Sequence, residues 1–163
     1  MEDKNKFHAI AKSPSLFRLY LLYKLPAAFF SGIKVREITN ERSTVSVPFK
    51  WLTQNPFRST YFASLAMAAE MSTGVLAMTN VYKRAPAISM LVTHMEASYF
   101  KKAKGISFFT CEQGLEIANE INAAATSSDS RTIKIKSTGR NINNELIAEF
   151  IFTWSFKAKS KIE

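Results

Sequence analysis

The chain has 163 residues and carries 22 Lys and Arg against 13 Asp and Glu, a formal charge of +9. This length suits one domain over residues 1–163, and a 47% share of hydrophobic residues is enough to fill its core. The single cysteine, Cys111, excludes an internal disulfide and a cysteine metal cluster, and we expect it to be a reduced thiol packed in a strand. The positive charge suits an anionic partner such as a nucleotide, a CoA phosphate, an acidic carrier protein, nucleic acid or a membrane surface, although it also serves solubility alone.

The first residues mix acidic and basic side chains without an adjacent apolar run, which does not indicate secretion and favours a cytoplasmic location. Residues 13–30 start with Ser-Pro and carry apolar side chains at helical spacing. They predict an amphipathic helix that covers the fold and bends at Pro26. Residues 33–38 and 45–49 predict two short strands joined by a turn.

The segment 59–82 holds a single charge, Glu70, among Ala, Leu, Met and Val. Its composition predicts a long helix with hydroxyl caps at Ser59 and Thr60. A membrane span is the competing interpretation, but polar side chains scattered through the segment favour a buried central helix; they include Glu70, Ser64, Ser72, Thr73 and Asn80. Burying a carboxylate is costly, so we expect Glu70 either to meet water or a ligand or to have a raised pKa.

Four strands are predicted after this helix, at 88–100, 106–111, 131–137 and 145–157, with a short helix at 112–125. In the first of them, His94 and Glu96 are expected to share a face with Met90, and without a third ligand they do not indicate a metal site. The last strand alternates large apolar and polar side chains most clearly. The element order predicts an α+β fold in which an antiparallel sheet wraps around one helix.

The stretch Asn-Pro-Phe-Arg-Ser-Thr-Tyr-Phe-Ala-Ser-Leu-Ala-Met-Ala-Ala-Glu, residues 55–70, resembles a motif of the hotdog-fold acyl-CoA thioesterase superfamily. The resemblance is to a branch related to phenylacetate-pathway and hydroxybenzoyl-CoA thioesterases. In that motif an Asn precedes a turn, a His-Gly pair and an acidic residue nine positions after the His. Tyr61 stands at the His position and Glu70 at the acidic one, while Phe62, Ala63 and Arg58 replace glycines. Residues 99–105 are similar to a strand-end motif, and the element order matches over about residues 30–158.

The resemblance implies a dimer or a dimer of dimers with the thioester bound between subunits. The backbone N–H of Phe62 would then polarise the thioester carbonyl, and Glu70 of the partner subunit would act as base or nucleophile. Asn55 would orient water or the carboxylate, unless it is an ordinary turn residue. Tyr61 would hydrogen-bond the thioester, although an aromatic residue at a helix start more often packs.

We expect the acyl chain to follow Leu65, Met67 and Met71, because methionine adapts to flexible apolar groups. The CoA phosphates would meet Lys101, Lys102 and Lys104, together with Arg58 or Arg140, although a Lys-rich turn is often only solvated.

The leading hypothesis is therefore an acyl-thioester hydrolase that acts on acyl-CoA or an acyl carrier protein, without a metal or a cofactor other than the CoA of the substrate. The alternative is a non-catalytic acyl-CoA-binding protein, favoured by the missing His and glycines. A third hypothesis, a basic module for nucleic acid or a membrane surface, rests on the charge alone. We expect no nucleic-acid partner and no membrane span.

Overall fold

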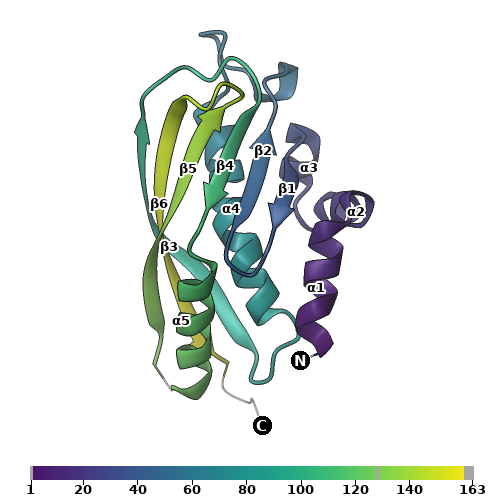
Figure 1. Ribbon diagram of the computed structural model, residues 1–163, viewed down its shortest axis with the longest axis vertical. Coiled ribbons are helices and arrows are strands. Elements are labelled where there is room, and N and C mark those ends of the chain that lie inside the picture. Colours follow the sequence, from purple (N-terminus) through teal and green to yellow (C-terminus); the bar gives the residue numbers. More distant parts are fainter. Residues whose placement is uncertain (1, 128, 160–163) are drawn as a thin grey trace.

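The computed structural model describes residues 2–127 and 129–159, and shows an antiparallel sheet bent around a long helix (Figure 1). The helices are α1 (Glu2–Lys12), α2 (Pro14–Lys24), α3 (Pro26–Ser31), the short 3-10 helix η1 (Trp51–Thr53), α4 (Phe62–Val81) and α5 (Gly114–Thr126). The strands are β1 (Lys34–Ile38), β2 (Ser43–Val47), β3 (Ile88–Tyr99), β4 (Ser107–Cys111), β5 (Arg131–Asn141) and β6 (Leu146–Ala158).

The six strands lie in the order β1-β2-β4-β5-β6-β3, and all neighbours are antiparallel. The inner face of this sheet holds α4, and α5 packs beside α4 against β5 and β6. On the other side, α1–α3 lie next to β1 and α4 (Figure 1). The α+β arrangement predicted from the element order, with one long central helix, is therefore present.

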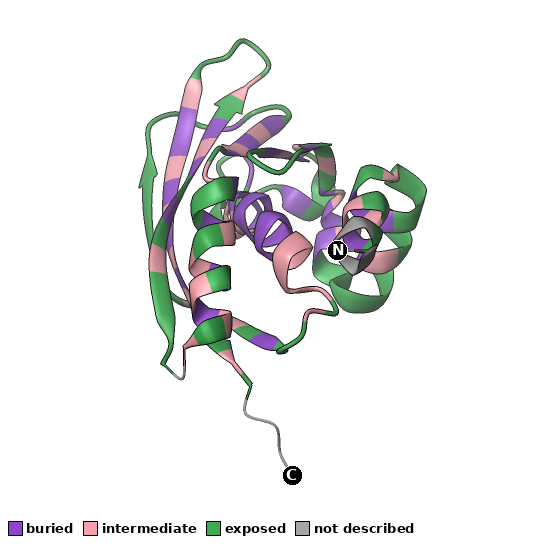
Figure 2. Ribbon diagram, turned by 60° about the horizontal axis from the view of Figure 1, so that its bottom comes forward, coloured by how far each residue is buried: buried purple, intermediate pink, exposed green. Residues whose placement is uncertain are grey.

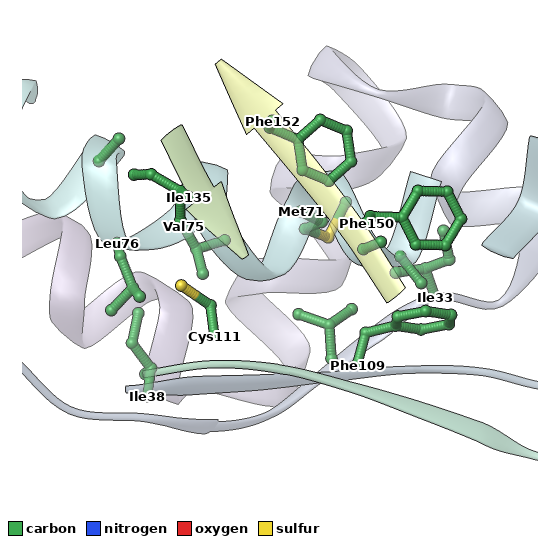
Figure 3. Packing of buried hydrophobic residues seen from close by; sticks show 14 of the residues in the cluster. Ile33, Ile38, Met71, Val75, Leu76, Phe109, Cys111, Ile135, Phe150 and Phe152 are labelled. Atoms are coloured by element: carbon green, nitrogen blue, oxygen red, sulfur yellow. The ribbon is translucent and has the colours of Figure 1, made fainter. Parts of the chain in front are cut away.

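The core forms where the inner side chains of the sheet meet α4 (Figure 3). In β6, Phe150, Phe152 and Trp154 point inward and are buried, whereas the residues between them are only partly buried. This is the alternation predicted for the last strand. Cys111 is a buried free thiol in β4, as expected, and burial raises its pKa to about 11.

Hydrogen bonds between polar side chains fix the rotation of α4 about its own axis. The Ser72 hydroxyl lies 2.8 Å from that of Ser137 on β5, and Trp154 Nε1 on β6 donates to Thr73 Oγ1 at 2.9 Å. Because Ser72 and Thr73 are held against the sheet, the opposite side of α4 faces away from it. Glu70, three residues before Thr73, lies beside it on the helix and projects into the space between β3 and the N-terminal helices.

The N-terminal segment differs from the predicted single bent helix. It forms α2 and α3, which are separated at Leu25, and Pro26 begins α3 at a first-turn position where its missing N–H costs little. Residues 2–12, for which the sequence predicted no element, form α1. That helix is anchored by the buried Phe7 and Ala11.

The prediction that His94 and Glu96 share a face with Met90 is wrong, because β3 contains a bulge. Its pairing with β6 shifts register between Val92 and His94, so Val92 lies opposite the inward Trp154 whereas His94 lies opposite Thr153. His94 and Glu96 therefore sit on the outer face, where Glu96 pairs with Lys134. Among the described residues, no three His, Cys, Asp or Glu form a group that fits a metal ion.

We predict that Gly139→Ala destabilises the fold, because a Cβ there would lie 2.3 Å from the ring of Phe109. Overpacking of this kind costs on the order of 1–3 kcal/mol, which thermal unfolding would show as a lower Tm. Gly105→Ala is the matched control, since no atom lies within 4 Å of its added Cβ. Equal Tm values for the two variants would contradict the packing described for β4 and β5.

Candidate functional site

The N-terminus of α4 has no side-chain cap. The helix begins at Phe62 rather than near Ser59, and its N-cap residue, Tyr61, makes no capping hydrogen bond. The predicted hydroxyl caps are therefore wrong: Ser59 Oγ instead donates to Asn55 Oδ1. As first-turn residues of a helix, Phe62 and Ala63 have backbone N–H groups without a partner inside it, so this end can receive an electronegative atom.

Asn55 holds the loop that leads into α4. Its Oδ1 accepts hydrogen bonds from the backbone N–H groups of Phe57 and Ser59, at 3.0 and 3.2 Å, and from the Ser59 hydroxyl. Within this loop Arg58 has φ +57°, a left-handed conformation that glycine adopts more easily. The backbone thus keeps the shape of a glycine turn although Arg58 replaces the glycine. The turn role of Asn55 is visible, and its role toward water or a carboxylate stays a prediction.

A cavity of about 590 Å³ lies at the N-terminus of α4. It brings together six residues predicted for the site, which are Asn55, Tyr61, Phe62, Leu65, Lys101 and Lys102, and the end of β3 adds Tyr99. Thr60 also lines the cavity, and its buried hydroxyl has no hydrogen-bond partner among the described residues. A buried hydroxyl without a partner is costly, so this cavity suits a ligand with a polar atom.

The basic residues predicted for phosphate binding occupy different settings. Lys101 forms an ion pair with Glu145, whereas the Lys102 ammonium lies 6.0 Å from the ring centre of Phe57. Lys104 is exposed on the same turn. Arg140 does not join them: it lines a separate hollow of about 510 Å³ on the outer face of the sheet and donates to the Asn144 carbonyl.

Glu70 lies in a second, smaller cavity of about 220 Å³ between α4, the N-terminal helices and β3. Burial raises the pKa of its carboxyl group to about 7. No hydrogen bond or ion pair to this carboxylate is present in the described part of the chain. Gly74, one turn later, leaves the room for it: a Cβ at position 74 would lie 3.0 Å from Glu70 Oε1.

The two cavities separate residues that the sequence placed in one site. Leu65 lines the larger cavity, Met71 lines the smaller one with Glu70, and the half-buried Met67 lines neither. Phe62 and Glu70 are eight residues apart, which is about 12 Å along a helix. Within one chain, the α4 N-terminus and the Glu70 carboxylate therefore do not meet.

Sequence reasoning missed the N-terminal part of the Glu70 cavity. Phe7 of α1, together with Phe17 and Tyr20 of α2, lines it opposite α4. The aromatic rings of Phe7 and Tyr20 meet edge to face with centres 5.6 Å apart. The amphipathic pattern of residues 13–30 indicated that one side of this segment is buried, but nothing in the sequence indicated that this side would meet Glu70.

Among the described residues, α4 is the one helix long and apolar enough to cross a membrane by length and composition. However, 67% of its most apolar window is buried inside the protein, as expected of a core helix. Figure 2 shows its buried surface enclosed by the sheet and the other helices.

Comparison with known proteins identifies the family. Residues 15–154 match the family described as Domain of unknown function (DUF4442). The chain belongs to this family. No curated protein matches the sequence.

Solved structures confirm the hotdog fold. A protein of unknown function from Pseudomonas aeruginosa, PA5026, described as a probable thioesterase, superposes with a TM-score of 0.75 at 17% identity, covering 90% of this chain and 97% of its own. OLEI01261 of Chlorobaculum tepidum, a protein of unknown function, superposes with a TM-score of 0.74 at 15% identity, covering 91% of this chain and 99% of its own. The thioesterase HI1161 of Haemophilus influenzae superposes with a TM-score of 0.64 at 12% identity, covering 89% of this chain and 92% of its own. At these identities the likeness establishes the fold.

We predict that Glu70 makes stability pH-dependent. Its folded-state pKa of about 7 lies above the ordinary value of 4.5, so the folded protein binds the proton more tightly and stability is lost as pH rises from about 4.5 through about 7. The loss should reach up to about 3 kcal/mol and should disappear in Glu70→Gln. Urea unfolding between pH 4 and 8 measures it. Glu112→Gln, at an exposed position, is the control and should keep the wild-type profile.

Proposed function

We propose that the protein is an acyl-thioester hydrolase that acts on acyl-CoA or an acyl carrier protein. The observation that carries this proposal is the Glu70 carboxyl group, which is held in an apolar cavity with a pKa of about 7. A base with a pKa near the working pH is well matched to activating water. The hotdog fold, which the chain shares with proteins described as thioesterases, supports the same reaction class.

In the proposed reaction, ionised Glu70 takes a proton from a water molecule as the water oxygen bonds to the thioester carbonyl carbon. The carbonyl oxygen becomes negative and accepts a hydrogen bond from the backbone N–H of Phe62. Collapse of this intermediate breaks the carbon–sulfur bond. The departing thiolate receives the proton from Glu70, which returns the base to its starting state and leaves a free carboxylic acid.

These groups belong to different cavities in one chain, so we propose that the site forms between two subunits. The strand β3 pairs with β6 alone among the described strands and leaves a twelve-residue edge open. After the bulge, Met95 and Tyr99 lie on the inner face of the sheet, yet 43% and 47% of their surfaces are exposed. A partner subunit added at this edge would cover them and place its Glu70 near the larger cavity.

For the substrate, we propose that the acyl group enters the Glu70 cavity and that the phosphates bind outside the larger one. The smaller cavity is lined by Met71, Met78 and Met90, whose side chains adapt to a flexible acyl chain. Lys102 and Lys104 remain for phosphate, together with Arg58, because Lys101 already pairs with Glu145.

A non-catalytic acyl-CoA-binding protein is the second candidate. The aromatic rings of Tyr61 and Phe62 meet edge to face, with centres 4.8 Å apart, at the point where the carbonyl would approach the helix N-terminus. Aromatic rings at that position favour apolar contact with a bound ligand over hydrogen bonding that would activate its carbonyl group.

We predict that Glu70→Gln lowers kcat for acyl-CoA hydrolysis by on the order of 10²-fold or more, because the amide keeps the shape but cannot take a proton. Acyl-CoA binding, measured by calorimetry, should stay within a few-fold of wild type. If wild type binds acyl-CoA tightly but hydrolyses none of a broad set, the non-catalytic candidate replaces the enzyme. If Glu70→Gln keeps full turnover, Glu70 is not the base.

We predict that Phe62→Pro lowers kcat by on the order of 10²-fold, because proline removes the proposed oxyanion donor. Proline is well tolerated at the first helical position, and Tyr61 already has the extended backbone, φ −63° and ψ 137°, that a following proline requires. Phe62→Ala is the matched control, since it removes the ring and keeps the N–H.

The same variants test the shared site. Unfolding and refolding a mixture of Glu70→Gln and Phe62→Pro chains should restore about a quarter of wild-type activity, because half of the dimers are mixed and each has one intact site of its two. If both variants are inactive alone and mixing restores nothing, the site does not lie between subunits.

A further inference from the structure

The outer surface of the N-terminal helices is unusually apolar. Leu16, Leu19 and Tyr23 lie at helical spacing along one side of α2 and are exposed, whereas Phe17 and Leu21 on the opposite side enter the core. Phe30 on α3 and Trp51 and Leu52 on η1 extend the same exposed surface. We call these six residues the N-terminal apolar face. Tyr23 and Trp51 are 77% and 80% exposed, although residues of this size are normally well buried.

α3 links the other two elements that carry this face, and cations lie at its margin. α3 packs against both α2 and η1. Lys50 Nζ donates to the Phe30 carbonyl at 2.8 Å, and the Arg18 guanidinium lies 4.5 Å from the ring centre of Phe29. In Figure 2 the outward sides of the N-terminal helices are coloured as exposed.

Most of this face lies within the longest run of the sequence without an acidic residue, which is bounded by Asp3 and Glu37. Residues 4–36 hold seven Lys and Arg and neither Asp nor Glu, a charge of +7 out of the total of +9. The remaining 15 cationic and 13 acidic residues give only +2. A strongly one-sided charge of this kind, next to an exposed apolar helix face, is typical of a segment that lies in a membrane interface.

We propose that the N-terminal apolar face docks the protein on the surface of an anionic lipid bilayer, with Leu, Phe and Trp side chains inserted at headgroup depth and the surrounding cations against the phosphates. A second copy of the chain fits this face less well, because a symmetric interface would bring the cations at its margin, Arg18 and Lys50, close to those of the other copy. Nucleic acid fits less well too, since the exposed leucines offer nothing to phosphates or base edges. Attachment of this kind leaves α4 in the core and spans no membrane.

Membrane docking would place the larger cavity near amphiphilic thioesters, since η1 leads directly into the loop that carries Phe57 to the cavity. That consequence rests on the proposed function. The docking itself does not, because vesicle binding is measured without hydrolysis.

The test is co-sedimentation of the full chain with vesicles of phosphatidylcholine alone and with vesicles in which about a third of the lipid is phosphatidylglycerol. We expect binding to the anionic vesicles that weakens as salt is raised. The double variant L19E/Y23E should reduce binding by on the order of tenfold or more, because both residues are removed from the lipid. Circular dichroism verifies that this variant, altered only at exposed positions, remains folded.

The matched control is L115E/I142E, which makes the same change in charge at two exposed apolar residues outside the N-terminal apolar face. It should retain most of the binding. Equal loss in the two double variants would overturn the proposal, because binding would then depend on net charge alone. Failure of the wild-type protein to bind anionic vesicles would also overturn it. If L19E/Y23E changes only the oligomeric state in light scattering, the proposal is overturned as well, because the face would then be a subunit interface.

Discussion

The burial of α4 is the constraint on which the rest of the structure depends. The helix is apolar on nearly every side, so the sheet, α5 and the N-terminal helices must cover it. Ser72 and Thr73 hydrogen-bond to β5 and β6 and fix its rotation, which directs Glu70 into the space between β3 and the N-terminal helices. The carboxylate is accommodated there because Gly74 supplies room, and the apolar surroundings supply the desolvation that raises its pKa.

This arrangement leaves two surfaces uncovered, and they differ in character. The inner face of β3 beyond its bulge carries exposed apolar residues next to an open backbone edge and has little charge of its own, so it suits a second sheet edge. The N-terminal apolar face combines exposed aliphatic and aromatic residues with a one-sided positive charge, which suits lipid. The proposed subunit pairing and the proposed membrane docking therefore use different surfaces and do not compete.

The sequence predicted the features that depend on local composition. A single carboxylate in a run of Ala, Leu and Met predicted both α4 and the perturbed Glu70, and strict alternation predicted β6. The bulge in β3 was missed because no glycine or proline marks it, and one extra residue there moved His94 to the other face. α1 was missed because it contains few apolar residues: Phe7 and Ala11 are buried and Ile10 packs against the core. The split between the two cavities depends on tertiary packing, which no local pattern encodes.

We expect the partly buried carboxyl group of Glu70 to titrate near neutral pH in the folded protein. ¹³C NMR of glutamate labelled at the side-chain carboxyl carbon measures this directly when the pH is varied, and Glu70→Gln identifies the resonance. We predict one glutamate resonance that titrates with a midpoint near pH 7 and is absent from the variant. A Glu70 midpoint close to the ordinary value of 4.5 would contradict this prediction, because it would mean that water solvates the carboxylate and burial does not raise its pKa.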